Sequence, residues 1–483
     1  MRILFVASEA APLAKTGGLA DVAGSLPRAL RSLGYEVAVF LPRYRRIDLS
    51  NARRVYDWLP VQLGAKRYDT SIYLIEDEVP YYLLDCPPLY DRAELYGDSD
   101  GDYPDNHIRF GVFCRAVFGV VRRVFMPHVL HLHDWQTGLV PVFLKTRFTA
   151  DPAFLGLKTL FTIHNLGYHG TFPPELMPDL DLDRALFRPD LLEFWGRFSF
   201  IKGGLIYSDM LNTVSRKYAE EIQTDEYGFG LDGLLRHRRQ DLFGILNGVD
   251  YEHWNPETDT FIAANYSAER LEGKRLCKAD LLREVGLPEK AMDRPLFGIV
   301  TRLVAQKGAE LIPCLGEVLE TEDAYLVCLG SGDAIYERAL ENMASRHPRR
   351  AAVRIGYNNA LSHKIEAGSD GFLMPSRYEP CGLNQIYSLR YGTVPVVRAT
   401  GGLDDTIREG TGFKFSEYSE AALKAAVRAA CTAYQNREEW TAMMRRGMQQ
   451  DFSWKVSAVE YAALYRQLRR GLNPGRLEPT LIT

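Results

Sequence analysis

The chain has 483 residues, more than one ordinary hydrophobic core accommodates, so its length predicts at least two domains. Hydrophobic residues make up 46% and charged residues 25%, a balance typical of a globular protein and not of a disordered or coiled-coil chain. Fifty-eight Lys and Arg against 62 Asp and Glu give a net charge of −4, which predicts no bulk attraction to nucleic acid or to an anionic membrane surface.

Targeting signals and cysteine spacing also narrow the possibilities. The sequence enters an apolar strand directly after Met1, without a leader peptide, and no apolar run reaches membrane-spanning length. The seven cysteines are scattered and form no CxxC pair, so neither a disulfide framework nor a zinc ribbon is predicted. We therefore expect a cytoplasmic protein without a structural metal.

The first half of the chain alternates between strand and helix patterns. The continuous apolar run 3–7 is typical of a strand buried on both faces of a parallel sheet. A glycine-containing turn follows, and apolar residues then recur at helical spacing over 19–31. Further strands are predicted at 36–41, 129–133 and 160–164. This alternation indicates a doubly wound α/β sheet.

The same alternation begins again in the second half, with strands predicted at 296–300, 325–329, 371–374 and 394–397. The hexapeptide TGGLAD at 16–21 recurs as TGGLDD at 400–405. One such motif in each half suggests two Rossmann-like domains, with a bipartite ligand site in a cleft between them. Turn-forming residues cluster over 244–256, where we expect the hinge.

Basic residues at strand-to-helix turns are candidates for binding a phosphate. Lys15 precedes two glycines at such a turn, where backbone N–H groups and the helix N-terminus favour an anion. Arg302 and Lys307 flank a second turn, and together they suit a diphosphate. The alternative, solvated surface cations, remains open for all three on these local features. Neither a Walker A motif nor a GxGxxG is present.

Three further groups could contact a sugar. Glu379 follows a buried strand and is placed to accept a hydroxyl hydrogen bond or support developing positive charge, although it could equally complement a helix dipole. Cys381 has no base near it in sequence, which favours a buried thiol over a nucleophile. His164 closes a strand and could serve a ligand, whereas structural hydrogen bonds are favoured for His131 and His133.

Taken together, these segments resemble the bacterial glycogen synthases and plant starch synthases. The matching segments are KTGGLADV at 15–22, HDWQTG at 133–138, IHNL at 163–166, LNGVD at 246–250, RL at 302–303 with QKG at 306–308, EPCGL at 379–383, TGGL at 400–403, FSW at 452–454 and YAALY at 461–465. They run in order along nearly the whole chain. Their combination is highly specific, although each piece alone is not.

The resemblance implies a retaining, metal-independent glucosyltransferase of GT-B architecture. It would need no cofactor and would transfer glucose from ADP-glucose to the non-reducing end of an α-1,4-glucan such as glycogen. The implied domains are 1–245 on the acceptor side, 246–455 on the donor side, and a C-terminal helix and tail at 456–483 that crosses back to the first domain.

The same resemblance assigns roles residue by residue. The catalytic group would be Glu379, His164, Arg302 and Lys307. Donor binding would fall to Lys15, Gly17, Gly18, Arg302, Lys307, Tyr357, Glu379, Cys381, Gly382 and Gly401, with Tyr357 against the adenine. Sugar and acceptor binding would fall to Asp21, Asp134, Asn165 and Asn247. Because no pair of carboxylates for a double displacement can be assigned, we expect front-face substitution in which Arg302 and Lys307 stabilise the departing diphosphate.

The sequence departs from the family pattern at two places. Ala309 and Glu310 stand where the family usually has Asp-Leu, and Tyr387 stands where the broader class of retaining transferases often has a second Glu. Three rival hypotheses remain: a non-catalytic glucan-binding protein, a transferase with another acceptor, and an NAD-dependent dehydrogenase. The diphosphate-binding cations argue against the first, the extent of the resemblance against the second, and the missing GxGxxG against the third.

Overall fold

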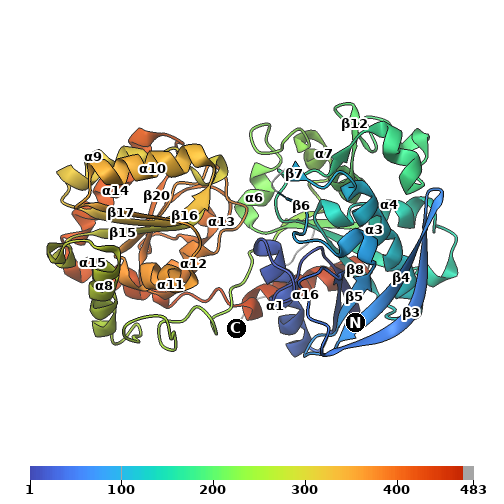
Figure 1. The fold of residues 1–483 in the computed structure, drawn as a ribbon, viewed down its shortest axis with the longest axis horizontal. Helices are drawn as coiled ribbons and strands as arrows, with labels where there is room; N and C mark the ends of the chain where they lie inside the picture. The colour runs from blue at the N-terminus through green and yellow to red at the C-terminus, as the bar shows by residue number, and fades with distance from the viewer. Residues whose placement is uncertain (99–100, 471–483) are drawn as a thin grey trace. The chain divides into compact units, whose positions relative to one another are not determined.

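The computed structural model describes residues 1–98 and 101–470, and the chain divides into two compact units (Figure 1). Unit 1 contains Met1–Val214, Ala219–Gly248 and the segment from Trp454 onward. Unit 2 contains Ser215–Tyr218 and Val249–Ser453. Neither unit is therefore a single continuous stretch of the sequence.

Unit 1 is built on a nine-stranded sheet within the described residues. The strands in sheet order are β14 (Leu242–Gly244), β13 (Met210–Thr213), β9 (Lys158–Ile163), β8 (Val129–His133), β1 (Arg2–Val6), β2 (Glu36–Pro42), β5 (Tyr81–Asp85), β4 (Lys66–Ile75) and β3 (Ala52–Leu63). All neighbours pair in parallel except β4, which is antiparallel to both β3 and β5. The long β3–β4 hairpin forms one edge of this sheet (Figure 1).

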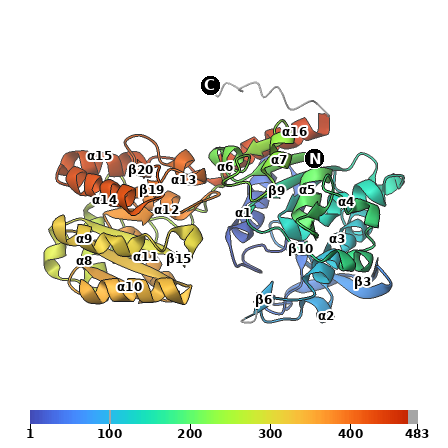
Figure 2. The same cartoon turned by 90° about the horizontal axis from the view of Figure 1, so that it is seen from above.

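Unit 1 also contains helices. They are α1 (Gly18–Ser32), α2 (Pro87–Tyr90), α3 (Asn106–Arg123), α4 (Leu139–Thr146), α5 (Phe200–Tyr207), α6 (Arg216–Glu221, which spans the boundary of the two units), α7 (Asp232–His237) and α16 (Trp454–Arg470). The last described helix, α16, packs against α1, the first helix of the chain, and against β9 (Figures 1 and 2). A small sheet of β10 (Thr171–Phe172), β12 (Arg197–Ser199) and β11 (Glu193–Phe194) and a short β6 (Gly97–Asp98) and β7 (Gly101–Asp102) pair lie outside the main sheet.

Unit 2 contains a six-stranded, fully parallel sheet in the described part of the chain. Its order is β17 (Ala351–Ile355), β16 (Tyr325–Gly332), β15 (Leu296–Leu303), β18 (Gly371–Met374), β19 (Val394–Arg398) and β20 (Phe413–Phe415). The helices are α8 (Glu272–Val285), α9 (Leu315–Thr321), α10 (Ala334–Arg346), α11 (Asn359–Gly368), α12 (Asn384–Arg390), α13 (Gly401–Thr406), α14 (Glu420–Tyr434) and α15 (Arg437–Met448).

Alternation along the strands of unit 2 creates a core on each face of the sheet. On β15, Phe297 and Ile299 join the core under α9, α10 and α14, whereas Leu296 joins the core under α8 and α11. Because side chains alternate between faces every second residue, strands that are apolar throughout can fill both cores. Figure 1 shows α9 and α10 on one side of this sheet and α8 and α11 on the other.

All eight strands predicted from the sequence are present, and the doubly wound α/β prediction is confirmed. The antiparallel β3–β4 hairpin was not predicted, because buried and exposed positions alternate cleanly only over 59–63 and not over the rest of β3 or over β4. In each unit the strand order reverses beside one strand, between β1 and β8 in unit 1 and between β15 and β18 in unit 2. Loops beyond the carboxyl ends of strands at such a point are where ligands bind in open α/β sheets. No helix among the described residues has the length and apolar character needed to cross a membrane.

Candidate functional site

In unit 2 a lysine and a glutamate meet at the point where the strand order reverses. Lys307 ends the 3-10 turn η6 (Ala305–Lys307) after β15, and Glu379 lies in the loop after β18. Lys307 Nζ lies 2.6 Å from Glu379 Oε2, and their side chains are only 19% and 6% exposed. Ser376 Oγ donates a hydrogen bond of 3.0 Å to the same oxygen. Glu379 Oε2 therefore has two donors, Lys307 Nζ and Ser376 Oγ, which together fix the orientation of the carboxylate.

Glycines let the backbone pass close to this pair. Gly308 has φ of +69°, and an ideal Cβ there would lie 2.1 Å from the Pro375 carbonyl oxygen. Gly401 has φ of +46°, and its Cβ would lie 1.9 Å from the Glu379 carbonyl oxygen. Gly382 has φ of +72°. A side chain at Gly308 or Gly401 would displace the segment that carries Glu379, so these two positions require glycine.

Three other predicted donor residues of unit 2 are Arg302, Tyr357 and Cys381. Arg302, near the end of β15, is exposed, and its side chain makes no hydrogen bond or ion pair with any described residue. Tyr357, two residues past β17, is 86% exposed, and its hydroxyl donates to Asn359 Oδ1 at 3.3 Å. Cys381 is buried at 6% exposure. An exposed guanidinium and an exposed ring at the carboxyl edge of a sheet can reach a ligand without losing an internal partner.

In unit 1 the loop after β1 is anchored by a buried carboxylate. Glu9, 3% exposed, accepts hydrogen bonds from the Thr16 backbone N–H and hydroxyl and, at 3.2 Å, from the Gly17 N–H. The Tyr96 hydroxyl also donates to Glu9, at 2.6 Å. Lys15 lies outside this network and pairs with Asp21 across 2.6 Å at the exposed start of α1. Glu9 therefore fixes the glycine loop and leaves the Lys15 ammonium at the surface.

Asp134 and His164 directly follow β8 and β9, the strands on the side of β1 that faces away from β2. Asp134 follows β8 with φ of +55°, a left-handed value that is strained for a residue with a Cβ, and such strain is found most often at functional positions. Asp134 Oδ1 accepts a 2.7 Å hydrogen bond from the His164 backbone N–H. Burial raises the pKa of Asp134 to about 7, and burial lowers the pKa of His164 to about 3. At neutral pH His164 is therefore an uncharged imidazole, able to donate and accept hydrogen bonds.

A series of buried rings connects His164 to helix α16. His133 Nδ1 lies 2.9 Å from His164 Nε2, and the rings of His131 and His133 have centroids 4.2 Å apart. His131 Nδ1 lies 2.7 Å from the hydroxyl of Tyr465 on α16. Burial lowers the pKa of His131 and of His133 well below the usual value, so all three imidazoles stay neutral. The structural role expected for His131 and His133 is confirmed, and the chain orients His164.

Two amides complete the predicted residues of unit 1. Asn165 Oδ1 accepts a 3.0 Å hydrogen bond from the Gly167 N–H and so stabilises the turn after β9. Asn247 lies past β14 and is 5% exposed, and its Oδ1 has no hydrogen-bond partner among the described residues. A buried acceptor without a donor is costly, which is the expected state of a group that a ligand hydroxyl satisfies.

The structure brings three predicted pairs into direct contact, namely Lys15 with Asp21, Asp134 with the His164 backbone, and Lys307 with Glu379. Sequence reasoning missed Glu9 and Ser376, which hold two of these loops. The only sequence signal for Glu9 was an acid directly after a buried strand. Within the described ranges no three His, Cys, Asp or Glu side chains are grouped as they would be to hold a metal ion.

Comparison with known proteins assigns the family. Residues 2–237 match the starch synthase catalytic domain model, and residues 287–446 match the glycosyl transferases group 1 model. The glycogen synthase of Koribacter versatilis is 51% identical over 479 residues, which cover 97% of this chain and 99% of that protein. The chain belongs to the glycogen synthase family.

Further relatives agree. The glycogen synthase of Anaeromyxobacter dehalogenans strain 2CP-C is 48% identical and covers 97% of this chain and all of that protein. Among solved structures, the catalytic domain of starch synthase IV from Arabidopsis thaliana, bound to ADP and acarbose, superposes with a TM-score of 0.88 at 32% identity, covering 97% of this chain and 99% of that chain. Sucrose-phosphate synthase from Thermosynechococcus elongatus, at 18% identity and a TM-score of 0.62, shares the fold. The glycosyltransferase activity and the GT-B class expected from the sequence are confirmed.

Proposed function

We propose that this glycosyltransferase elongates an α-1,4-glucan such as glycogen at its non-reducing end, with ADP-glucose as donor and retention of the anomeric configuration. The single observation that carries the proposal is the Lys307–Glu379 pair, 2.6 Å apart where the strand order of unit 2 reverses. The near full-length identity to curated glycogen synthases and the ADP in the starch synthase IV structure support it.

The donor would be bound by unit 2. Arg302 and Lys307 supply two positive charges for the diphosphate, and charge-assisted hydrogen bonds to phosphate are among the strongest available to a protein. Tyr357 presents an exposed ring for the adenine, as stacking on a flat base requires. Glu379, with one oxygen held by Lys307, keeps its other oxygen for a glucose hydroxyl, and Cys381, Gly382 and Gly401 would line the same loop.

Unit 1 would bind sugar hydroxyls. His164 stays neutral because burial lowers its pKa to about 3, so it can hydrogen-bond a hydroxyl without charging. Asn247 offers an unpartnered buried Oδ1, and Asp134 and Asn165 fix the loop beside His164. Lys15, with Asp21 and the open glycines 17 and 18, would add a charge for the donor from this unit.

In the chemical step the C1–O bond to the diphosphate breaks and the acceptor O4 forms a bond to C1 on the same face of the ring. Negative charge grows on the departing oxygen, where Arg302 and Lys307 stabilise it. The acceptor proton passes to that oxygen, so atoms and charge balance without a protein nucleophile. We further propose a cytoplasmic location, supported by the seven cysteines, which form no disulfide in the structure.

The test uses the purified full-length protein with glycogen and either ADP-glucose or UDP-glucose, with and without a chelator. We expect ADP release matched by chain extension, chelator-insensitive, and new residues removable by an exo-acting α-1,4-glucosidase. Arg302→Ala should lower turnover by about 10²-fold, as loss of a transition-state charge does. No extension with either donor would overturn the synthase proposal, and a preference for UDP-glucose would overturn the donor assignment.

A further inference from the structure

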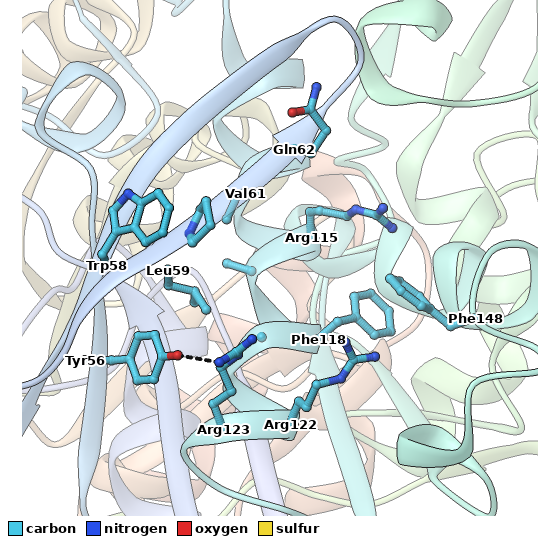
Figure 3. A pocket seen from close by; sticks show the side chains of 13 residues that line it. Tyr56, Trp58, Leu59, Val61, Gln62, Arg115, Phe118, Arg122, Arg123 and Phe148 are labelled. Carbon is cyan, nitrogen blue, oxygen red and sulfur yellow. Dashed lines mark hydrogen bonds between the residues drawn. The ribbon is translucent and has the colours of Figure 1, made fainter.

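A pocket of about 340 Å³ lies in unit 1 between the edge strand β3, helix α3 and Phe148 (Figure 3). None of the predicted site residues lines it in the described part of the chain. Its volume falls within the range of small-molecule sites. The pocket is therefore a candidate for a ligand other than the donor and acceptor.

The local backbone explains why the pocket forms. Gly119 on α3 faces β3, and an ideal Cβ there would lie 2.7 Å from Leu59 Cδ1, so the glycine lets strand and helix approach closely. The β3–β4 register shifts between Arg54 and Tyr56 and again between Tyr56 and Leu59. Such irregularities redirect side chains at a sheet edge. Tyr56 and Trp58 thereby line the rim of a built pocket rather than a flat sheet.

Three arginines of α3 contribute to the wall (Figure 3). Arg115, Arg122 and Arg123 stand at positions i, i+7 and i+8, which one helix face carries. Arg122 pairs with Asp151. The Arg115 side chain has no hydrogen bond or ion pair with any residue that the structure describes, although its Nη1 is buried. Arg123 donates to the Tyr56 hydroxyl at 2.6 Å and has no carboxylate partner among those residues.

Aromatic rings hold the guanidinium groups in place. The Arg115 Cζ lies 4.7 Å from the centre of the Phe148 ring, and the Phe118 and Phe148 rings pack with centroids 4.2 Å apart. Cation–π contacts of this kind fix orientation, and neither Arg115 nor Arg123 forms an ion pair with a carboxylate among the described residues. A partly buried charge without a counter-charge is costly, and a bound anion removes that cost.

We propose that this pocket binds a sugar phosphate, with Arg115 and Arg123 on the phosphate group. Guanidinium forks match phosphate oxygens in geometry, and two of them without carboxylate partners favour a charged ligand over a neutral glucan. The sugar would lie toward Trp58, which is 53% exposed and is oriented by an Nε1–H hydrogen bond of 3.0 Å to Asp69. Gln62 also lines the pocket. Its Nε2 donates a 2.8 Å hydrogen bond to the Gly64 carbonyl oxygen, so its Oε1 would accept one from a sugar hydroxyl.

The test titrates the full-length protein with α-D-glucose 1-phosphate by calorimetry, with saturating ADP present to block the donor site. We expect one saturable site, competition by inorganic phosphate at lower affinity, and no competition by maltoheptaose. The double variant Arg115→Gln/Arg123→Gln should bind at least tenfold more weakly. Arg53→Gln is the matched control, because Arg53 lies on β3, the strand beside the pocket, pairs with Glu76 and does not itself line the pocket. It should bind within twofold of the wild type.

Circular dichroism melting checks that each variant folds, and the exposed Arg123→Gln alone serves if the double variant does not. Absence of saturable binding by the wild type would overturn the proposal, as would equal affinity in wild type and arginine variants. Displacement by maltoheptaose but not by phosphate would overturn the charged ligand. Equal affinity for phosphate and glucose 1-phosphate would overturn the sugar part.

Discussion

The hexapeptide TGGLxD occurs once in each unit, and its two copies do different work. At 16–21 the glycines Gly17 and Gly18 have open space where a side chain would be, and neither has a positive φ. At 400–405 Gly401 has φ of +46° and packs against the Glu379 carbonyl oxygen. The same sequence thus leaves a helix N-terminus accessible in unit 1 and positions a buried loop in unit 2. The residues packed against each copy, and not the motif itself, determine its structural role.

Each motif is also associated with a lysine–carboxylate pair at 2.6 Å. Lys15 and Asp21 are exposed by 54% and 29%, whereas Lys307 and Glu379 are exposed by 19% and 6%. An exposed pair contributes at most about 1 kcal/mol to stability, while breaking a buried pair costs about 3–5 kcal/mol. Lys15 in unit 1 can therefore exchange its partner at little cost, whereas Lys307 in unit 2 is fixed by its buried carboxylate.

The largest expected effect is that of Lys307→Met. Removing the ammonium leaves Glu379 buried without its counter-charge, so the free energy of unfolding should fall by about 3–5 kcal/mol. Turnover per folded molecule should fall by about 10²–10³-fold, because the leaving group loses a stabilising charge. Chemical denaturation and steady-state kinetics measure the two effects.

Lys278→Met is the matched control for this prediction. Lys278 pairs with Asp370 at 2.6 Å, with side chains that are 5% and 15% exposed, but Asp370 precedes β18 instead of following it. We expect a similar loss of stability with turnover within twofold. If both variants lost turnover alike, the buried Lys307 pair would be structural only.

Gly401→Ala and Gly17→Ala test the two motif copies directly. Alanine at Gly401 meets both a left-handed φ and a 1.9 Å contact, so unfolding free energy should fall by about 1–3 kcal/mol or more, and turnover should fall as Glu379 moves. Alanine at Gly17 meets nothing, and the change should stay below about 0.5 kcal/mol. Thermal and denaturant unfolding of both variants decides the matter. Equal destabilisation would show that the copies are equivalent.

The buried groups of unit 1 predict a particular pH dependence. Burial lowers the pKa of His164 to about 3, so below pH 6.5 the unfolded chain takes up a proton that the folded chain does not. Stability is therefore lost as the pH falls from about 6.5 towards 3. His164→Asn should reduce that slope by up to about 1.4 kcal/mol per pH unit, measured by unfolding between pH 4 and 6.

Asp134→Asn provides the opposite sign. Burial raises the pKa of Asp134 to about 7, so the folded chain holds a proton that the unfolded chain has released above pH 4. This carboxyl group therefore lowers the free energy of unfolding as the pH rises from about 4 to 7, and the asparagine variant should not show that decrease. An unchanged slope in both variants would contradict the account of a neutral site in unit 1.

The smallest expected effect on stability is that of Lys15→Gln. Because the pair with Asp21 is exposed, unfolding free energy should change by less than about 0.5 kcal/mol, while the KM for the donor should rise. Lys424→Gln, which breaks another exposed pair at 2.9 Å, should leave KM unchanged. A destabilisation as large as that of Lys307→Met would erase the contrast between the two pairs.

Much of the fold could be predicted from the sequence, because strands buried on both faces are uniformly apolar and are bounded by turn residues. The predicted ends of 129–133 and 371–374 coincide with β8 and β18, and Lys307 and Glu379 could be placed after their strands. What could not be predicted depends on which strands are neighbours. Lys307 and Glu379 are 72 residues apart in the sequence, and they can touch only because β15 lies beside β18 in the sheet.

Some side-chain roles are also invisible in a linear sequence. Tyr387, which stands where the broader class often has a second Glu, stacks on Trp254 with ring centroids 4.4 Å apart and so has a packing role. Glu9 and Ser376 looked like ordinary polar residues near strand ends. Their importance comes from burial beside a loop backbone, which only the tertiary structure defines.

Helix α16 has a consequence for how the molecule is made. It belongs to unit 1 but is the last described helix to leave the ribosome. Its Tyr465 hydroxyl is hydrogen-bonded to His131 on β8, a strand that is synthesised much earlier. Domains usually fold in order of synthesis. Here the N-terminal sheet must wait, with His131 and Asn212 lacking their tyrosine partners, until α16 has also been synthesised. Nascent chains that end before α16 would therefore carry an incomplete unit 1 and expose it to chaperones and proteases.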